Sequence, residues 1–404
     1  MVDKTRPLAG YKVIDFSAVY AGPICTRMLQ DCGAEVIKVE PPGMGDLTRG
    51  VAGMSPVFAH FNAGKKSVAI DLKQARGREL ARELIRGADI VVENFRPGIM
   101  QRFGLDYHSL SAQQPALVYC SISGFGQSGP WVNRAAFAPI VHAASGFDTV
   151  FARAQGDKAD IARSGANRPS AGDTPRPPNW EIMVADILTG AYAFGAIQTA
   201  LLGRINSGRG EHIDVSMMDA MMTLIPAQLQ AAQNTTKVPI GCFYPIHTRD
   251  GYIMVTGITD KNLQSLSEVL KRPDLLQDPR FVFGPRTENH HWLALEIEKW
   301  SANLTTAECE EMLNEAGIPC ATYPELEDLF SHPQVVERGS FNTVSNNALG
   351  EFLIQNMPVK FSQTENQTAS WVANLGEHSA EVLHGELGLP LQEIERLRAQ
   401  NIIR

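Results

Sequence analysis

The chain has 404 residues, 44% of them hydrophobic, and its 36 basic and 44 acidic residues give a net charge of −8. This length suggests two or three domains whose cores need neither metals nor disulfides. The acidic balance excludes the broadly basic surface that general nucleic-acid binding requires, so we expect no nucleic-acid partner.

The cysteines and the N-terminal residues indicate a compartment. Six cysteines are scattered without a Cys-x-x-Cys pair, a usage typical of a reducing environment. The start, MVDKTRPLAGYKVIDF, lacks the apolar run of a signal peptide, and no stretch reaches the roughly 18 apolar residues of a membrane helix. We therefore expect a soluble, cytoplasmic protein without a membrane partner.

Strand and helix patterns alternate over the first 125 residues. Strands separated by helices imply βαβ units around a largely parallel sheet, and therefore an α/β fold. The predicted strands are 11–17, 35–39, 67–72, 90–93 and 117–121, and the predicted helices are 23–32 and 77–86.

The amino-acid composition changes in the middle of the chain. Residues 153–180 are polar and contain four prolines, which predicts a long surface loop. Residues 182–205 are apolar on nearly every face and predict a buried helix. A strand at 213–217 and a helix at 218–233 follow.

After residue 234 a second series of elements begins. It comprises a strand at 252–257 and helices at 262–270, 291–300 and 306–316, and it ends near residue 330. The remaining chain predicts a strand at 352–361 and helices at 377–387 and 391–401.

Two familiar kinds of site are disfavoured. The segment 124–129, GFGQSG, matches G-x-G-x-x-G, but Pro130 follows and helix signal resumes only near Ala138, so it predicts a tight turn near a ligand rather than a nicotinamide site. His142 and the pair His290 and His291 lack partners at metal-ligand spacing, and we expect no metal.

Asp186 is an acid in apolar surroundings, within MVADILTGAYAFGAIQTALLG. A carboxylate there is costly unless it is hydrogen-bonded or used in chemistry. It is interpreted either as a helix cap or as a nucleophile. The two roles are compatible, because a helix N-terminus stabilises a carboxylate by about 0.3–1 kcal/mol and keeps it ionised.

Several longer segments carry a resemblance by their order and spacing. They are LAGYKVIDFSAVYAGPICTRMLQDCGAEVIKVEPPGMGDLTR, FNAGKKSVAIDLK, VVENFRPGIMQRFGLDY, SISGFGQSGP, ADILTGAYAFGAIQTALLGRINSGRGEHIDVSMMDAM, AGIPC and LGEHSAEVL. Together they resemble the class III CoA transferases, which include the formyl-CoA:oxalate and carnitine CoA transferases. The similarity runs nearly end to end.

The resemblance implies roles for individual residues. Asp186 falls on the family's catalytic aspartate, and Val19 and Ala21 fall on the loop beside the CoA chain. The positions that would hold the nucleotide end of CoA are Ile70, Lys73, Asn94, Phe95 and Arg102. Lysine and arginine suit phosphates, although taken alone Lys73 and Arg102 also fit ordinary solvated surface charge.

The implied chemistry uses CoA thioesters as substrates, with no permanently bound cofactor. Asp186 would attack the donor thioester to give a mixed anhydride, and the released thiolate would convert it to an aspartyl-CoA thioester. The acceptor carboxylate would then attack, and the thiolate would return to the new acyl group. Backbone N–H groups would stabilise the oxyanions.

The implied fold is a Rossmann-like large domain with a parallel sheet plus a smaller α/β domain, in a ring-shaped protomer of an interlocked homodimer. Residues 1–225 would form the N-terminal part of the large domain, 226–330 the small domain, and 331–404 a segment that returns to the large domain. The active site would lie at the junction of domains and subunits.

Two other functions stay open. Racemases acting on α-methylacyl-CoA resemble this chain in fold but carry a catalytic His in G-H-D, where the chain has Phe137 in Ala-Phe-Ala. Phe cannot exchange a proton, and Asp186 alone is no two-base pair. The alternatives to a transferase are therefore a racemase-like isomerase and a non-catalytic CoA-binding protein.

The substrate is less defined than the family. The glycine-rich loop of some family members has no clear counterpart around 241–251, which argues against formyl-CoA or oxalate. Within the 153–180 loop, Arg163, Arg168 or Arg176 could meet a second carboxylate. We expect a small C4–C5 dicarboxylate such as succinate or mesaconate, unless this loop is simply solvated.

Overall fold

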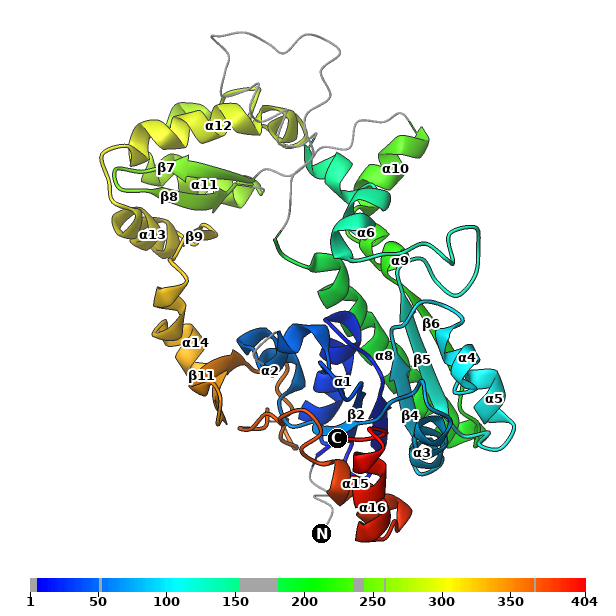
Figure 1. Ribbon diagram of the computed structural model, residues 1–404. Coiled ribbons are helices and arrows are strands. Elements are labelled where there is room, and N and C mark those ends of the chain that lie inside the picture. The colour runs from blue at the N-terminus through cyan, green and yellow to red at the C-terminus, as the bar shows by residue number, and fades with distance from the viewer. Residues whose placement is uncertain (1–5, 51–52, 153–180, 235–242, 258, 367) are drawn as a thin grey trace. The chain divides into compact units, whose positions relative to one another are not determined.

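The computed structural model describes residues 6–50, 53–152, 181–234, 243–257, 259–366 and 368–404 (Figure 1). These residues divide into two compact units. The first takes its residues from before 153, from 181–226 and from 334–404, and the second from 227–333. The chain therefore leaves the first unit after Pro226 and re-enters it at Gln334.

A six-stranded sheet forms the centre of the first unit, and all its neighbouring strands are parallel. Its strands are rich in valine and isoleucine, and β4 and β5 are buried along their whole length, as expected for a parallel sheet covered on both faces. The strands are β1 (Lys12–Asp15), β2 (Glu35–Glu40), β3 (Lys66–Ala69), β4 (Ile90–Glu93), β5 (Val118–Ser123) and β6 (His212–Ser216).

Helices cover both faces of this sheet (Figure 1). On one face α1 (Ala21–Asp31) and α8 (Val184–Ser207) pack over Val13 and Val36. On the other, α3 (Ala75–Arg86) packs with the C-terminal helices α15 (Ser379–Leu387) and α16 (Leu391–Ala399) over alternate residues of the same strands. The alternation of neighbouring side chains between the two faces follows from the period of a strand.

The strand order is β3-β2-β1-β4-β5-β6. Strands β2 and β3 are added on one side of β1, and β4, β5 and β6 are added on its other side. The direction in which the sheet grows therefore reverses between β1 and β4. In open α/β sheets ligands bind at this switch point, outside the carboxyl ends of the strands. The segments at that place are 16–20, after β1, and 94–98, after β4.

Helix α8 approaches α1 closely at Gly190. A Cβ atom there would lie 2.7 Å from the carbonyl oxygen of Ala21 and 2.8 Å from a methyl carbon of Ile24, so only glycine permits this contact. Gly190 lies about one turn after Asp186 on the same helix. The close contact therefore brings Asp186 to the N-terminal end of α1.

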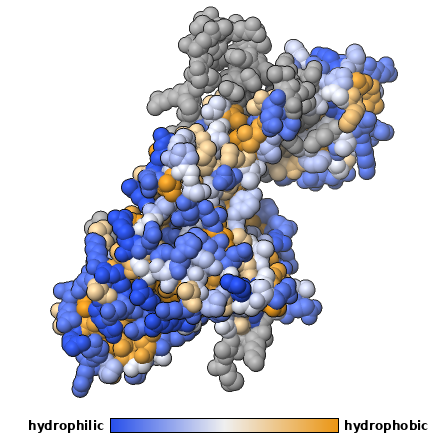
Figure 2. Space-filling model, turned by 90° about the vertical axis from the view of Figure 1, so that its right-hand side faces the viewer, coloured by the Kyte–Doolittle hydropathy of each residue, from blue (hydrophilic) through white to orange (hydrophobic). Residues whose placement is uncertain are grey.

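The expectation that α8 is buried all round is wrong for one face. Ile187, Tyr192, Leu202 and Ile205 are exposed, although the opposite face lies in the core. Among the described residues α8 is the one helix long and apolar enough to cross a membrane, a test that core helices of soluble proteins also pass. On the face drawn in Figure 2, apolar patches are interspersed with hydrophilic residues.

The residues after 333 add to the first unit. Strands β10 (Phe341–Asn346) and β11 (Gly350–Gln355) form a separate antiparallel pair that packs on α2 (Pro56–Asn62). The strand expected at 352–361 thus ends at Gln355 and does not join the main sheet. Near the end of the chain, Ile403 pairs with Ile70 beyond β3.

The second unit has its own core. Its strands β7 (Phe243–His247), β8 (Tyr252–Thr256) and β9 (Cys320–Thr322) form an antiparallel sheet. Leu266, Phe281 and Leu313 are among its buried core residues. Its main helices are α11 (Asp260–Val269), α12 (Pro285–Ser301) and α13 (Thr306–Glu315), with the short helices η2 (Pro273–Leu276) and η3 (Glu327–Phe330).

The helix expected at 218–233 is broken. It forms α9 (Met217–Met222) and α10 (Pro226–Asn234), because Pro226 cannot continue a helix but fits its first turn. The remaining short elements are η1 (Leu47–Arg49), α4 (Ile99–Phe103), α5 (Tyr107–Ser111), α6 (Ala138–Ala144) and α14 (Pro333–Glu337).

Candidate active site

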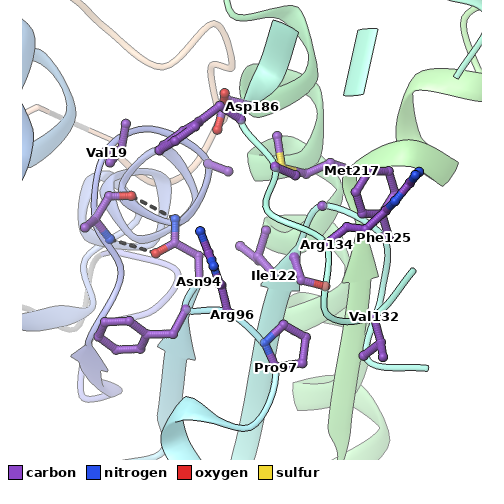
Figure 3. A pocket seen from close by; sticks show the side chains of 17 residues that line it. Val19, Asn94, Arg96, Pro97, Ile122, Phe125, Val132, Arg134, Asp186 and Met217 are labelled. Carbon is purple, nitrogen blue, oxygen red and sulfur yellow. Dashed lines mark hydrogen bonds between the residues drawn. The ribbon is translucent and has the colours of Figure 1, made fainter. Parts of the chain in front are cut away.

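Two adjoining cavities of the first unit lie where β1 and β4 end, and they share Ala18 and Phe95. The first has a volume of about 150 Å³ and contains Asp186 (Figure 3). The second has a volume of about 330 Å³ and mainly apolar walls. Its lining residues include Phe16, Val39, Leu47, Ile70, Leu72, Lys73 and Phe103.

The structure brings most of the predicted residues to these cavities. Val19, Ala21, Asn94, Phe95 and Asp186 line the first, while Ile70, Lys73 and again Phe95 line the second. Arg102 lines neither cavity; it is exposed on α4, next to Phe103 of the second cavity. Arg163, Arg168 and Arg176 lie outside the described residues.

Asp186 is in the first turn of α8 but does not cap its own helix. The N-cap residue of α8 is Met183, which makes no side-chain cap bond, so the cap interpretation fails for α8 and applies instead to α1, whose first residue is Ala21. The carboxylate instead accepts a hydrogen bond from the backbone N–H of Ala21, at the start of α1. This bond links the two helices at the cavity.

Burial dominates the charge state of Asp186. Desolvation raises the pKa of its carboxyl to about 6, and the Ala21 N–H opposes this rise only partly. The expected stabilisation by a helix N-terminus is therefore present but smaller than the effect of burial. At neutral pH the carboxylate is still mainly ionised, but it is poorly solvated and so more reactive as a nucleophile.

His142 holds the start of α8 from a neighbouring helix. Its buried ring Nε2 accepts a hydrogen bond of 3.0 Å from the N–H of Ala185, the residue before Asp186. Burial lowers the pKa of His142, which suits a neutral acceptor. Within the described ranges no group of three or more His, Cys, Asp or Glu side chains could hold a metal ion.

The loop 17–20 between β1 and α1 is held by side chains. Asn94 holds Ala18 on both sides, accepting from its N–H and donating to its carbonyl at 2.8 Å each (Figure 3). Lys38 donates to the carbonyl of Ser17 at 2.6 Å, and Asp46 accepts from the N–H of Val19 at 3.1 Å. Sequence reasoning did not single out Lys38 or Asp46, because neither is near this loop in the chain.

Two arginines add positive charge to the first cavity. Arg96 and Arg134 line it together with Asp186, the one acid among its lining residues. In the view of Figure 3 the Arg96 side chain extends toward the Asp186 end. The guanidinium of Arg134 lies 4.1 Å from the centre of the Trp131 ring. The sequence could have indicated Arg96 as a site residue, because it directly follows Asn94 and Phe95 at the end of a predicted strand.

Two segments noted in the sequence form the cavity wall. Phe137, which replaces the histidine of the racemases, lines the cavity and is 62% exposed. Gly124 of GFGQSG also lines it, and a Cβ atom there would lie 2.3 Å from that of Ala136. As expected, no helix starts at GFGQSG, and the chain is next helical at α6.

Comparison with known proteins decides the family. The model of CoA-transferase family III matches residues 8–379. The chain belongs to this family. A family III transferase takes CoA thioesters as substrates, so the cavity with its ionised Asp186 and the adjoining apolar cavity are the places to look for its chemistry.

Several relatives of this family III transferase match it over almost their full lengths. A succinate–glutarate CoA-transferase of Agrobacterium fabrum is 32% identical over 98% of both chains. A succinyl-CoA–D-citramalate CoA-transferase of Chloroflexus aurantiacus is 31% identical over 98% of both chains. The crystal structure of a CAIB/BAIF family protein from Brucella suis, 29% identical, covers 95% of this chain and 100% of its own with a TM-score of 0.77.

Proposed function

We propose that the chain transfers CoA from an acyl-CoA donor to a carboxylic acid through an aspartyl-CoA intermediate on Asp186. The observation that carries this proposal is the position of Asp186. It is the one carboxylate lining the first cavity, it receives the Ala21 N–H, and its pKa of about 6 leaves it ionised at pH 7. An ionised, partly desolvated carboxylate is a competent nucleophile toward a thioester.

The steps balance without a further reactant. A carboxylate oxygen of Asp186 attacks the thioester carbon, the C–S bond breaks, and the products are a mixed anhydride and a CoA thiolate. The thiolate attacks the aspartyl carbonyl and releases the donor acid. The acceptor acid then reverses both steps. The Ala21 N–H is placed to donate to the aspartyl oxygen, where negative charge develops.

The second cavity suits the nucleotide end of CoA. Its apolar walls, including Ile70, can receive a flat adenine ring, and Lys73 supplies a cation for phosphate. Because Phe95 and Ala18 line both cavities, the pantetheine chain would pass between them to Asp186. Arg102, next to Phe103, is proposed only as an outer contact for the phosphates.

We propose a small C4–C5 dicarboxylate, such as succinate or mesaconate, as one of the acids. Two observations support this choice: Arg96 and Arg134 offer a cation for a second carboxylate, and two relatives are named for succinate, glutarate and citramalate. No observation favours the isomerase, because Phe137 occupies the cavity position where a proton-exchanging base would be needed.

We also propose a cytoplasmic homodimer of interlocked, ring-shaped protomers. The exposed apolar face of α8, with Ile187, Leu202 and Ile205, supports a protein partner on this helix. In this assembly we expect the described residues before 153, together with 181–226 and 334–404, to form the large domain and residues 227–333 the small one. A monomer mass in light scattering at micromolar concentration would contradict the dimer.

The deciding experiment measures covalent adducts by mass spectrometry. The protein is incubated with a panel of acyl-CoAs without acceptor, and a CoA-sized adduct is expected on the peptide that contains Asp186. Asp186→Ala should abolish it. Asp219→Ala is the matched control, because Asp219 is also an acid in the first turn of a helix but lines neither cavity.

Each outcome has a meaning. An adduct with succinyl-CoA but not with a monocarboxylic analogue of equal length supports the dicarboxylate proposal, and the reverse preference contradicts it. Bound CoA with no adduct from any donor would contradict the transferase mechanism. Proton exchange at the α-carbon is then the next measurement, since it would reveal an isomerase.

A further inference from the structure

The backbone of Val19 has an unusual conformation. Its φ angle is +71°, in the left-handed region that a β-branched residue rarely adopts. Such strain persists only where the surroundings enforce it, and it tends to occur at functional sites. Val19 lies at the wall of the cavity that contains Asp186, two residues before the Ala21 N–H that bonds to this acid.

Asp46 is the residue that holds Val19 in place. Both of its carboxylate oxygens accept from the N–H of Val19, at 3.1 and 3.2 Å. One of these oxygens also accepts from the N–H and the hydroxyl of Thr48, at 2.9 and 2.8 Å. The side chain is completely buried and ion-paired with Lys38 at 3.0 Å.

Asp46 and Lys38 together form a clamp on the loop 17–20, and Lys38 holds its other side. It donates to the carbonyl of Ser17 at 2.6 Å, so the Lys38–Asp46 pair holds the backbone on both sides of Ala18. Asn94 holds Ala18 itself. The loop conformation therefore depends on a buried ion pair rather than on a ladder of backbone bonds.

We propose that Asp46, paired with Lys38, is a positioning residue that keeps Val19 in the left-handed conformation and so aims the Ala21 N–H at Asp186. The carboxylate of Asp46 is buried, although the residue belongs to the wall of the second cavity; its effect on the reaction passes through the backbone of residues 19–21. This inference rests on the proposed function for its catalytic readout. The ordinary alternative is that the pair stabilises only the fold.

The first test compares two buried ion pairs. In Asp46→Asn the amide NH2 group has to face either Lys38 or Thr48, and both of these are hydrogen-bond donors. We therefore expect the rate of aspartyl-CoA formation to fall at least tenfold, while the KM for acyl-CoA changes less than threefold. The control is Asp31→Asn, which breaks the buried Arg27–Asp31 pair in α1. We expect this control to lower stability but to keep the rate within twofold of the wild type.

The second test relieves the strain. Glycine adopts positive φ freely, so in the Val19→Gly background the loop no longer needs Asp46 to hold it. We expect Asp46→Asn to lower the rate of aspartyl-CoA formation at least tenfold in the wild-type chain but less than threefold in the Val19→Gly background. An equal cost in both backgrounds, or no cost in either, would overturn the inference.

Stability provides a readout that needs no catalysis. The wild type, Asp46→Asn, Val19→Gly and the double variant form a double-mutant cycle. The fall in melting temperature caused by Asp46→Asn should be smaller in the Val19→Gly background than in the wild-type chain. If wild-type protein forms no adduct, the proposed function fails while this cycle still tests the clamp. If Asp46→Asn alone does not fold, recovery of folding in the Val19→Gly background supports the clamp, and failure there as well contradicts it.

Discussion

At the scale of single residues, Asp186 shows how far a sequence can lead. Its isolation in an apolar segment marked it as costly, and the family pattern marked it as catalytic. Its partner was not visible, because the Ala21 N–H comes from a helix more than 160 positions away in the chain. A backbone donor has no sequence signature, so only the folded geometry shows that Asp186 links two helices.

The raised pKa of Asp186 predicts how the reaction depends on pH. Only the ionised carboxylate attacks, so the single-turnover rate of aspartyl-CoA formation should fall about tenfold per pH unit below about 6 and level off above it. Stopped-flow or quenched-flow measurement between pH 5 and 8 checks this, with CoA affinity measured at each pH as the control. A constant rate over this range would contradict the prediction.

The same shift has a consequence for stability. Between about pH 4 and pH 6 the folded chain holds a proton on Asp186 that the unfolded chain releases, so stability contributed by this group falls as the pH rises. Asp186→Asn should therefore be more stable than the wild type at pH 7, by up to about 3 kcal/mol, and the difference should shrink toward pH 4. Urea unfolding at both pH values measures it.

At the scale of elements, the strands of the main sheet were predictable because each is a short apolar run between polar segments. What the pattern did not show was which helix faces become exposed or how helices approach. Residues Ile187 and Leu202 of α8 are as apolar as the core residues of that helix, yet they are exposed. Composition alone cannot distinguish a face that packs on a sheet from one that is free for another partner.

Gly190 predicts a large effect from a single added methyl group. In Gly190→Ala the new Cβ would collide with the Ala21 carbonyl and with Ile24, so α8 should move away from α1. We expect this movement to destabilise the protein by about 1–3 kcal/mol and to slow adduct formation at Asp186. Gly195→Ala is the matched control on the same helix, because its Cβ would meet nothing within 4 Å. It should leave the rate unchanged and stabilise the helix slightly.

The comparison is made by thermal unfolding and by adduct mass spectrometry on both variants. Equal stabilities and equal rates for the two alanine variants would show that the close approach of α8 to α1 does not position Asp186.

At the scale of the whole molecule, the first unit combines residues from both ends of the chain. The N–H of Asp71 donates to the carbonyl of Ile402 at 2.8 Å, and Ile403 pairs with Ile70. Ile70 and Asp71 both line the second cavity. The tail of the chain thus supports a wall of the proposed CoA site, which no local pattern in the sequence could show.

This arrangement predicts that two equally buried isoleucines differ in function. Ile403→Ala and Ile394→Ala each remove a side chain from the same core, and each should cost about 2–5 kcal/mol in stability. Only Ile403→Ala should also weaken CoA binding, by several-fold in calorimetry, because the backbone of Ile403 pairs with Ile70 of the second cavity, whereas Ile394 lies within helix α16. An equal loss of affinity in both variants would mean that it reflects stability alone.

The return of the chain at Gln334 also fixes an order of events during translation. The six strands of the main sheet are synthesised before the second unit, but α15, α16 and the pairing of Ile403 with Ile70 come after it. While the ribosome makes residues 227–333, one face of the nascent sheet has no C-terminal helices to cover it. The protein's demand on chaperones should therefore be greatest at this stage, before the wall of the nucleotide cavity exists.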